Sequence, residues 1–191
     1  MITVNIILSF IFVTIIGNAL ISAWQHNNWL WQQRFEKKSA NINNLKEMFD
    51  DLVQLSSKRR YVMLRAVYAI KSGKREKIDE VRTQYDEVVK EWNLRLNEFL
   101  IKLVFHVGED EMQRLEHDIS RKFTDLGARI EKLIRDPKQS NRALLNNLEN
   151  CLNVLNNEIF RLNRDIYRAI INTQRKEIFS EEYHIELVVL P

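Results

Sequence analysis

The stretch IDEVRTQYDEVVKEWNLRLNEFLIKL, residues 78–103, indicates the fold class of this chain. Its apolar residues recur every three or four positions, a spacing that places them on one face of an α-helix. They are Ile78, Val81, Tyr85, Val88, Trp92, Leu96, Phe99 and Leu103. This seam predicts a helix over about 76–105 that packs at a small angle against other helices.

Three further segments carry the same spacing. We expect helices at about 25–72, 109–135 and 140–179, the last one capped by Ser140. Their seams are Phe35, Ile42, Leu45, Phe49, Leu52, Met63, Ala66 and Ile70; Met112, Leu115, Ile119, Phe123, Leu126, Ile130 and Leu133; and Leu145, Leu148, Leu152, Leu155, Ile159, Leu162, Ile166 and Ala169.

Chain breakers separate these four segments. Only 4 Gly and 2 Pro occur in 191 residues, so few turns can form. The stops are Ser72-Gly73-Lys74, His106-Val107-Gly108 and Arg135-Asp136-Pro137. Short connections make consecutive helices antiparallel, so the sequence predicts an all-α, up-down four-helix bundle with long helices over 25–179.

The N-terminal stretch ITVNIILSFIFVTIIGNALISA, residues 2–23, is apolar throughout. A bilayer core of roughly 30 Å requires about 20 such residues, and Trp24, Trp29 and Trp31 follow as an interfacial aromatic belt would. A cleaved signal peptide would instead need a positive N-terminus and a small residue where Ile21 stands. We therefore expect residues 1–24 to form a single-pass transmembrane anchor. The sequence leaves open whether this helix continues into the first bundle helix.

The cations that flank the anchor predict its orientation. None precedes the apolar stretch, whereas Arg34, Lys37, Lys38 and Lys46 follow it. Positive residues are retained in the cytoplasm, so we expect a cell-membrane protein with the N-terminus outside and the helical domain in the cytoplasm.

A polar stripe lies within the anchor. Thr14, Asn18 and Ser22 are four residues apart and share one helix face. Polar side chains in hydrocarbon can join helices, so this face is a candidate association surface. Alternatively, the hydroxyl groups bond back to their own helix, which leaves Asn18 to be explained.

The seam of the first bundle helix is interrupted in its middle. After Leu52, the seam positions fall on Ser56 and Arg59 before apolar residues resume at Met63. Polar residues at core positions lower stability unless they are satisfied, and they often mark a site. Two hypotheses remain open: Arg59 is buried beside a carboxylate, or a gap in the bundle binds an anionic ligand.

Cations gather around this interruption and on the last helix. The candidate anion or partner patch comprises Lys58, Arg59, Arg60, Arg65, Arg161, Arg164 and Arg168. We expect the two groups to be exposed together at the end of the bundle far from the membrane. The simpler interpretation is a solvated surface of salt bridges, and binding of nucleic acid or another anionic ligand is the less favoured alternative.

The C-terminal segment, residues 180–191, differs from the helices. Its β-branched residues and terminal Pro191 suggest an extended, apolar tail. Such a tail either folds back on the bundle or docks on a partner.

No motif for catalysis, nucleotide binding or metal binding stands out. A di-iron bundle needs inward Glu and His residues, yet the seams contain none, and Glu181-x-x-His184 lies in the tail. His106 and His117 are interpreted as solvated residues, and the single Cys151 as a core-edge residue. We expect neither an enzyme nor a protein with a cofactor.

Two functional hypotheses follow. The first is a membrane-anchored interaction or scaffold module that contacts other proteins and self-associates. The second is a ligand-responsive sensor or effector, in which an anion bound at the basic patch shifts the transmembrane helix. The arrangement broadly resembles the membrane-proximal sensor bundles of chemoreceptors, although those return to the membrane through a second span that this chain lacks. The partner, the number of subunits and the biological pathway are not encoded in any recognisable motif.

Overall fold

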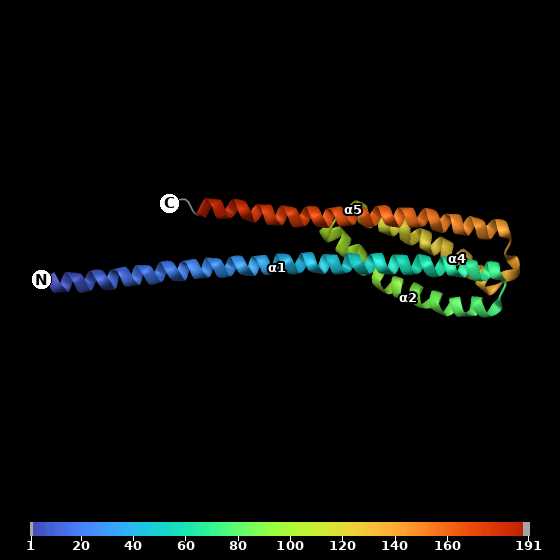
Figure 1. Ribbon diagram of the computed structural model, residues 1–191, viewed down its shortest axis with the longest axis horizontal. Helices are drawn as coiled ribbons and strands as arrows, with labels where there is room; N and C mark the ends of the chain where they lie inside the picture. Colours follow the sequence, from blue (N-terminus) through green and yellow to red (C-terminus); the bar gives the residue numbers. More distant parts are fainter. Residues whose placement is uncertain (1, 189–191) are drawn as a thin grey trace. The chain divides into compact units, whose positions relative to one another are not determined.

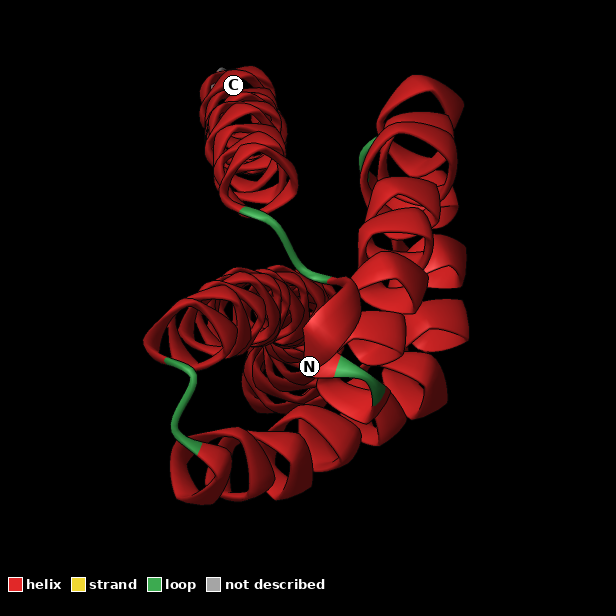
Figure 2. Ribbon diagram, turned by 90° about the vertical axis from the view of Figure 1, so that its right-hand side faces the viewer, coloured by secondary structure: helices red, strands yellow, loops and turns green. Residues whose placement is uncertain are grey.

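The computed structural model describes the backbone of residues 2–188 and the side chains of residues 12–176. Helices joined by short connections make up this part of the chain, and residues 2–188 contain no strand (Figure 2). The protein is therefore all-α, as the periodicity predicts. It divides into two compact units, Met1–Asn43 and Asn44–Pro191.

The second unit is the bundle. Its first helix is the part of α1 (Ile2–Ser72) that follows Asn44, and its second is α2 (Arg75–His106). The third is a continuous rod of α3 (Glu109–Gln113), the π-helix η1 (Arg114–Ser120) and α4 (Arg121–Arg135). The fourth is α5 (Arg142–Val188). Consecutive helices of this unit reverse direction, as predicted (Figure 1).

The predicted seams form the core of this unit. The apolar seam residues of α2 are buried except for the half-buried Leu96, and the rod buries its seam except for the half-buried Met112. In α5 the buried seam ends on Ile170 rather than on Ala169. Residues at seam positions are buried because a spacing of 3.5 residues keeps them facing the neighbouring helices.

The ends of the helices are close to the predicted stops. Gly73 follows the last residue of α1 and has a φ of 66°, a conformation that favours glycine. Its N–H donates to the carbonyl of Ile70 at 3.1 Å. The predicted cap of the last helix, Ser140, is wrong. Asn141 caps α5, because its side-chain oxygen accepts a hydrogen bond from the N–H of Leu144 at 2.8 Å, while the Ser140 hydroxyl donates to the carbonyl of Pro137.

A close approach of α2 to α4 explains a glycine in the middle of a helix. A Cβ atom on Gly127 would lie 2.5 Å from the hydroxyl oxygen of Tyr85, which is buried. The small residue therefore makes room for the phenol ring.

This contact predicts opposite effects of one substitution in two backgrounds. Gly127→Ala should lower the free energy of unfolding by about 1–3 kcal/mol, because the core is overpacked at the Tyr85 hydroxyl. With Tyr85→Phe in place, the same alanine should be neutral or stabilise by about 1 kcal/mol through its helix propensity. Thermal unfolding of the four proteins measures this coupling, and equal losses in both backgrounds would contradict the contact.

The first unit, Met1–Asn43, consists of the N-terminal part of α1, which runs without a break through residues 26–28. The division between the units falls after Asn43, whereas the predicted anchor ends at residue 24. Phe35, expected in the bundle seam, is exposed, and the buried seam begins at Leu45. The bundle therefore starts about three helical turns later than the periodicity suggests.

No helix among the described residues contains a segment long and apolar enough to cross a membrane. The predicted span at residues 2–23 lies partly outside them, because the side chains of residues 2–11 are not described.

The prediction of an extended C-terminal segment is wrong as far as Val188, because the backbone is helical up to that residue. Residues 180–188 are the last turns of α5, because no Gly or Pro interrupts the chain between Pro137 and Pro191. Residues 189–191 and the side chains beyond 176 lie outside the description. Whether the tail folds back or docks on a partner stays a prediction.

Candidate functional site

Arg59 is the most unusual residue of the bundle core. It lies on the inward face of α1, one turn after Ser56, and its exposed fraction is 3%. The helix runs straight through this position, so an arginine at a seam position has to point inward. Ser56 satisfies its own hydroxyl group by donating to the carbonyl of Val53 at 3.1 Å.

Two aromatic rings surround the Arg59 guanidinium. Its central carbon lies 5.3 Å from the ring centroid of Trp92 on α2 and 4.8 Å from that of Phe123 on α4. The two rings meet edge to face with their centroids 5.1 Å apart. A cation over an aromatic face gains about 0.5–2 kcal/mol. The aromatic residues therefore compensate for part of the hydration that the cation has lost.

No carboxylate neutralises this cation. The Nε and Nη1 groups of Arg59 are buried and have no hydrogen-bond partner. Burial lowers the pKa of Arg59 to about 10, so the side chain keeps its charge at neutral pH. Among residues 12–176, the hypothesis that Arg59 pairs with a carboxylate is therefore wrong, and two acids on α2 and α5 pair with other cations at the surface. Glu91 binds Lys58 at 2.8 Å, and Glu158 binds Lys122 at 2.6 Å.

A π-helical turn ends beside the same layer. The last residue of η1, Ser120, is buried and its hydroxyl oxygen accepts a hydrogen bond from the indole N–H of Trp92 at 3.4 Å. π-helical turns insert an extra residue and are frequent at functional sites. We name Ser56, Arg59, Trp92, Ser120 and Phe123 the Arg59 layer.

The other predicted cations of α1 are mostly engaged in surface pairs with α2. Arg65 donates to Gln84 at 2.8 Å and pairs with Glu80 at 3.2 Å, while Lys58 pairs with Glu91. Arg60 resembles its neighbour Arg59, since its Nε group is buried without a hydrogen-bond partner. These pairs agree with the salt-bridged surface that was the simpler interpretation.

The arginines of α5 do not join the cations at the Gly73 end of the bundle. Glu149 of α5 binds Tyr68 and Lys71, whereas the ring of Tyr167 of α5 packs at a tilt against that of Phe49. This antiparallel register places residues 161–168 nearer to the Asn44 end of the unit. The expectation of one shared surface far along the bundle is therefore wrong.

Asp165 organises two of these arginines. Its carboxylate lies 3.5 Å from Arg164 and 3.9 Å from Arg168, and it accepts a hydrogen bond from Arg114 of η1 at 3.0 Å. The hydrogen bond from the guanidinium of Arg114 makes the largest contribution to lowering the pKa of Asp165. Arg161 is exposed and forms no ion pair within 4 Å among the described residues. Of the predicted patch, only Arg59 and Arg60 thus have buried N–H groups without partners among residues 12–176.

The Tyr68, Lys71 and Glu149 cluster predicts a pH effect. The hydrogen bonds from Lys71 and Tyr68 lower the pKa of Glu149 below its ordinary value. A carboxylate whose pKa is lower in the folded than in the unfolded state stabilises the folded protein when the pH is above the unfolded-state pKa. This stabilisation is lost as the pH falls through the folded-state pKa. Glu149→Gln should therefore reduce stability at pH 7 but have less effect at pH 3. Thermal unfolding at both pH values checks this, and an equal effect at both would contradict the pairing.

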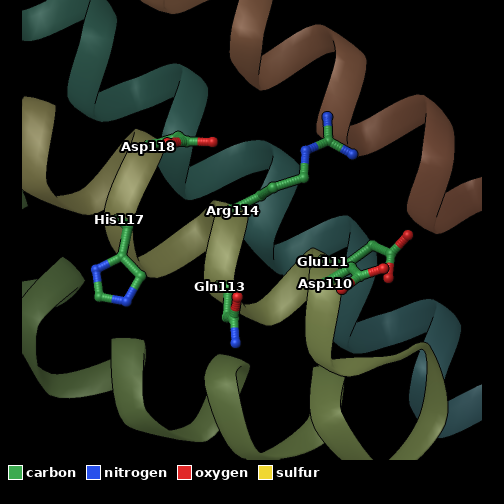
Figure 3. Close-up of a pocket in the computed structure, with 6 residues that line it drawn as sticks. All are labelled: Asp110, Glu111, Gln113, Arg114, His117 and Asp118. Atoms are coloured by element: carbon green, nitrogen blue, oxygen red, sulfur yellow. The ribbon is translucent and has the colours of Figure 1, made fainter.

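A polar hollow on the bundle surface lies along α3 and η1. Asp110, Glu111, Gln113, Arg114, His117 and Asp118 line it (Figure 3). Arg114 reaches toward α5, and the ring of His117 points the opposite way, so the two side chains do not converge on one point. His117 is well exposed and lies 3.8 Å from Glu116. The hollow offers no arrangement of an acid, a base and a nucleophile.

The described residues contain no group of three His, Cys, Asp or Glu side chains that could hold a metal ion. Cys151 is half-buried, and its Sγ atom lies 3.8 Å from the Oδ1 atom of Asn147.

The predicted association face of the anchor lies in the first unit. Thr14, Asn18 and Ser22 are exposed, as are most of the apolar side chains around them. The large exposed apolar residues are Phe12, Val13, Ile15, Ile16, Leu20, Ile21, Trp24, Trp29, Trp31 and Phe35.

Comparisons with known proteins add no further constraint: no family model, curated protein or solved structure matches the chain.

Proposed function

We propose that this chain is a membrane-anchored interaction module, in which residues 2–23 lie in a bilayer and the helical bundle presents a surface to partner proteins. The observation that carries the proposal is the exposure of large apolar side chains around most of α1 between Phe12 and Trp24, with the polar stripe of Thr14, Asn18 and Ser22 on the remaining face. A helix that exposes so wide an apolar surface requires an apolar environment. A bilayer supplies it, and the first charged side chain, Arg34, follows the tryptophans at 24, 29 and 31.

Membrane extraction tests the anchor. The full chain should remain in the membrane pellet after alkaline carbonate washing. Ile15→Lys with Ile16→Lys places two charges in the middle of the apolar stretch and should release most of the protein, because each charge there costs about 3 kcal/mol. Ala40→Lys with Asn43→Lys, which places two such charges in the polar part of α1, is the matched control and should stay in the pellet. Release of the unaltered chain would overturn the anchor.

The proposed orientation places the N-terminus outside and the bundle in the cytoplasm. The cations Arg34, Lys37 and Lys38 support it, because they lie within the range of about 15–20 residues over which flanking charges act, whereas Lys46 lies beyond that range. Alkaline phosphatase fused after Pro191 should be inactive in a bacterial host, since this enzyme matures outside the cytoplasm. An active fusion would reverse the orientation.

An exposed apolar stripe on α2 supports the partner surface. Leu94, Ile101 and Phe105 are seven and four residues apart, so they share one helix face, and all three are well exposed. Exposed apolar groups of this kind are typical of interaction sites. When the full chain is purified from detergent, a partner protein should co-purify with it. The partner should be absent when the double variant Ile101→Ser, Phe105→Ser is purified in the same way. Val154→Ser on α5, a change of another exposed residue, should keep it.

A second candidate function rests on the Arg59 layer. An anion that reached the unpartnered N–H groups of Arg59 and Arg60 would gain charge-assisted hydrogen bonds and would alter how α1 packs. In this reading the chain is a ligand-responsive effector. Inorganic pyrophosphate, used as a probe, should raise the melting temperature of the full chain but not that of Arg59→Met. Equal shifts in both proteins would remove this candidate.

A further inference from the structure

The seam of α1 does not end where the bundle ends. Inside the bundle, alternate steps of three and four residues join buried positions of α1, which are Leu45, Met48, Leu52, Leu55, Arg59, Val62, Ala66 and Ala69. The same steps taken backward from Leu45 reach Ile42, Lys38, Phe35, Trp31, Asn28 and Trp24. A heptad repeat therefore extends through the first unit, with Trp24 and Trp31 at d positions and Phe35 and Ile42 at a positions.

The aromatic residues of this repeat lack the cover that the bundle gives to the same helix face, whereas Lys38 and Ile42 are half-buried. The exposed fractions are 68% for Trp24, 42% for Trp31 and 48% for Phe35, while Leu45 is 4% exposed. The rings of Trp31 and Phe35 stack on each other with centroids 5.7 Å apart, and together they form an exposed aromatic surface. The unit Met1–Asn43 contains no second helix among its described residues that could cover them.

A bilayer is a poor cover for this segment. Arg34, Glu36, Lys37 and Lys38 are interleaved with the seam residues, and burial of such charges in hydrocarbon is unfavourable. The segment also contains many weak helix formers, such as Asn27, and an isolated helix of this kind is marginal in water. Its helical state requires a polar-surfaced partner with an apolar seam.

We propose that the partner is a second copy of this chain, which pairs with the first as a parallel two-stranded coiled coil over residues 24–42. The parallel orientation rests on the proposed membrane anchor, because two anchors in one bilayer begin their helices at the same level. The pairing face is the heptad seam, which is distinct from the Thr14, Asn18 and Ser22 stripe.

The residues beside the seam fit a second copy. The flanking e and g positions are uncharged except for Arg34, and they bring no like charges together across the pair. They are Gln25, Gln32 and Ser39 at e, and Asn27, Arg34 and Asn41 at g. Asn28 occupies an a position, where a buried asparagine fixes the register of parallel dimers at some loss of stability.

The extent of the pairing is bounded by the chain itself. From Leu45 onward the bundle of the same chain buries the seam, so a second copy cannot contact it there. Lys38 at a d position weakens the middle of the pair. The dimer is therefore expected to be short and to depend on the aromatic residues.

Cysteine crosslinking of the full chain in membranes tests the pairing. In a Cys151→Ser background, Asn28→Cys places a thiol at an a position and His26→Cys places one at an outward f position. Both sites are exposed in the single chain, so they differ only in the proposed dimer. Mild oxidation should convert most of the Asn28→Cys chain, and little of the His26→Cys chain, to a disulfide-linked dimer.

A second substitution separates specific pairing from collision. Phe35→Asp should abolish the Asn28→Cys crosslink, whereas Gln33→Asp, the same charge at an f position, should leave it. Crosslinking of both cysteines alike, or of neither, would overturn the dimer. Carbonate washing of the same membranes reports on the anchor separately, so a crosslinked but extractable protein would sink the anchor and keep the dimer.

Discussion

Trp92→Ala is expected to lower the free energy of unfolding by about 3–5 kcal/mol, the range for large aromatic residues removed from a core. The indole ring is fully buried and contacts two other helices, since it covers the Arg59 guanidinium of α1, packs on Phe123 and donates to Ser120 of the rod. Its removal leaves a cavity, a cation with one ring fewer and a buried hydroxyl without a donor. A domain of this size is stable by about 5–15 kcal/mol, so the loss is a large share of the total.

Thermal unfolding of the full chain in mild detergent, followed by circular dichroism, measures this effect. Trp92→Phe is the matched control because it keeps an aromatic face over Arg59 while losing the hydrogen bond to Ser120. It should lose clearly less than the alanine variant. Equal losses for the two variants would show that the effect comes from the lost hydrogen bond to Ser120 and that the ring over Arg59 contributes nothing.

Arg59→Met is expected to have the opposite sign. Replacement of a buried charge by an apolar residue of similar length often stabilises a protein by about 1–4 kcal/mol. Here the guanidinium has two buried N–H groups without partners and no carboxylate, so little is lost with it. The methionine keeps contact with Trp92 and Phe123, because its thioether packs well against aromatic rings.

Arg59→Lys provides the control for charge. A lysine retains the cation but loses the planar group that stacks on the rings, so this variant should be less stable than the unaltered protein. The measurement is the midpoint of thermal unfolding of all three chains. A destabilised Arg59→Met protein would mean that the guanidinium has a stabilising partner and would contradict the description of the Arg59 layer.

The architecture could be predicted from the sequence to a large extent, because it depends on periodicity. The seam of α2 from Ile78 to Leu103 is buried almost residue by residue. The stop at Gly73 followed from a glycine at a helix end, which is local chemistry. The helix cap at Asn141 was missed because two neighbouring polar residues compete for that role, and the geometry of the turn decides between them.

The candidate site was only half predictable. Its location was visible as Arg59 at a seam position, but the aromatic partners come from helices distant in the sequence, and no local pattern links them. The π-helical turn left an ambiguous signal. Leu115, Ile119 and Phe123 show two consecutive steps of four, yet Val88, Trp92 and Leu96 show the same steps in a regular α-helix.

We infer that α1 is one helix whose successive parts are covered in different ways. Hydrogen–deuterium exchange of the full chain in a lipid bilayer tests this most directly. We predict strong amide protection at residues 2–23 from the bilayer and at residues 45–70 from the bundle, with weaker protection at residues 24–43. Rapid exchange at residues 2–23 in the bilayer, or exchange at residues 45–70 as fast as at 24–43, would contradict the account.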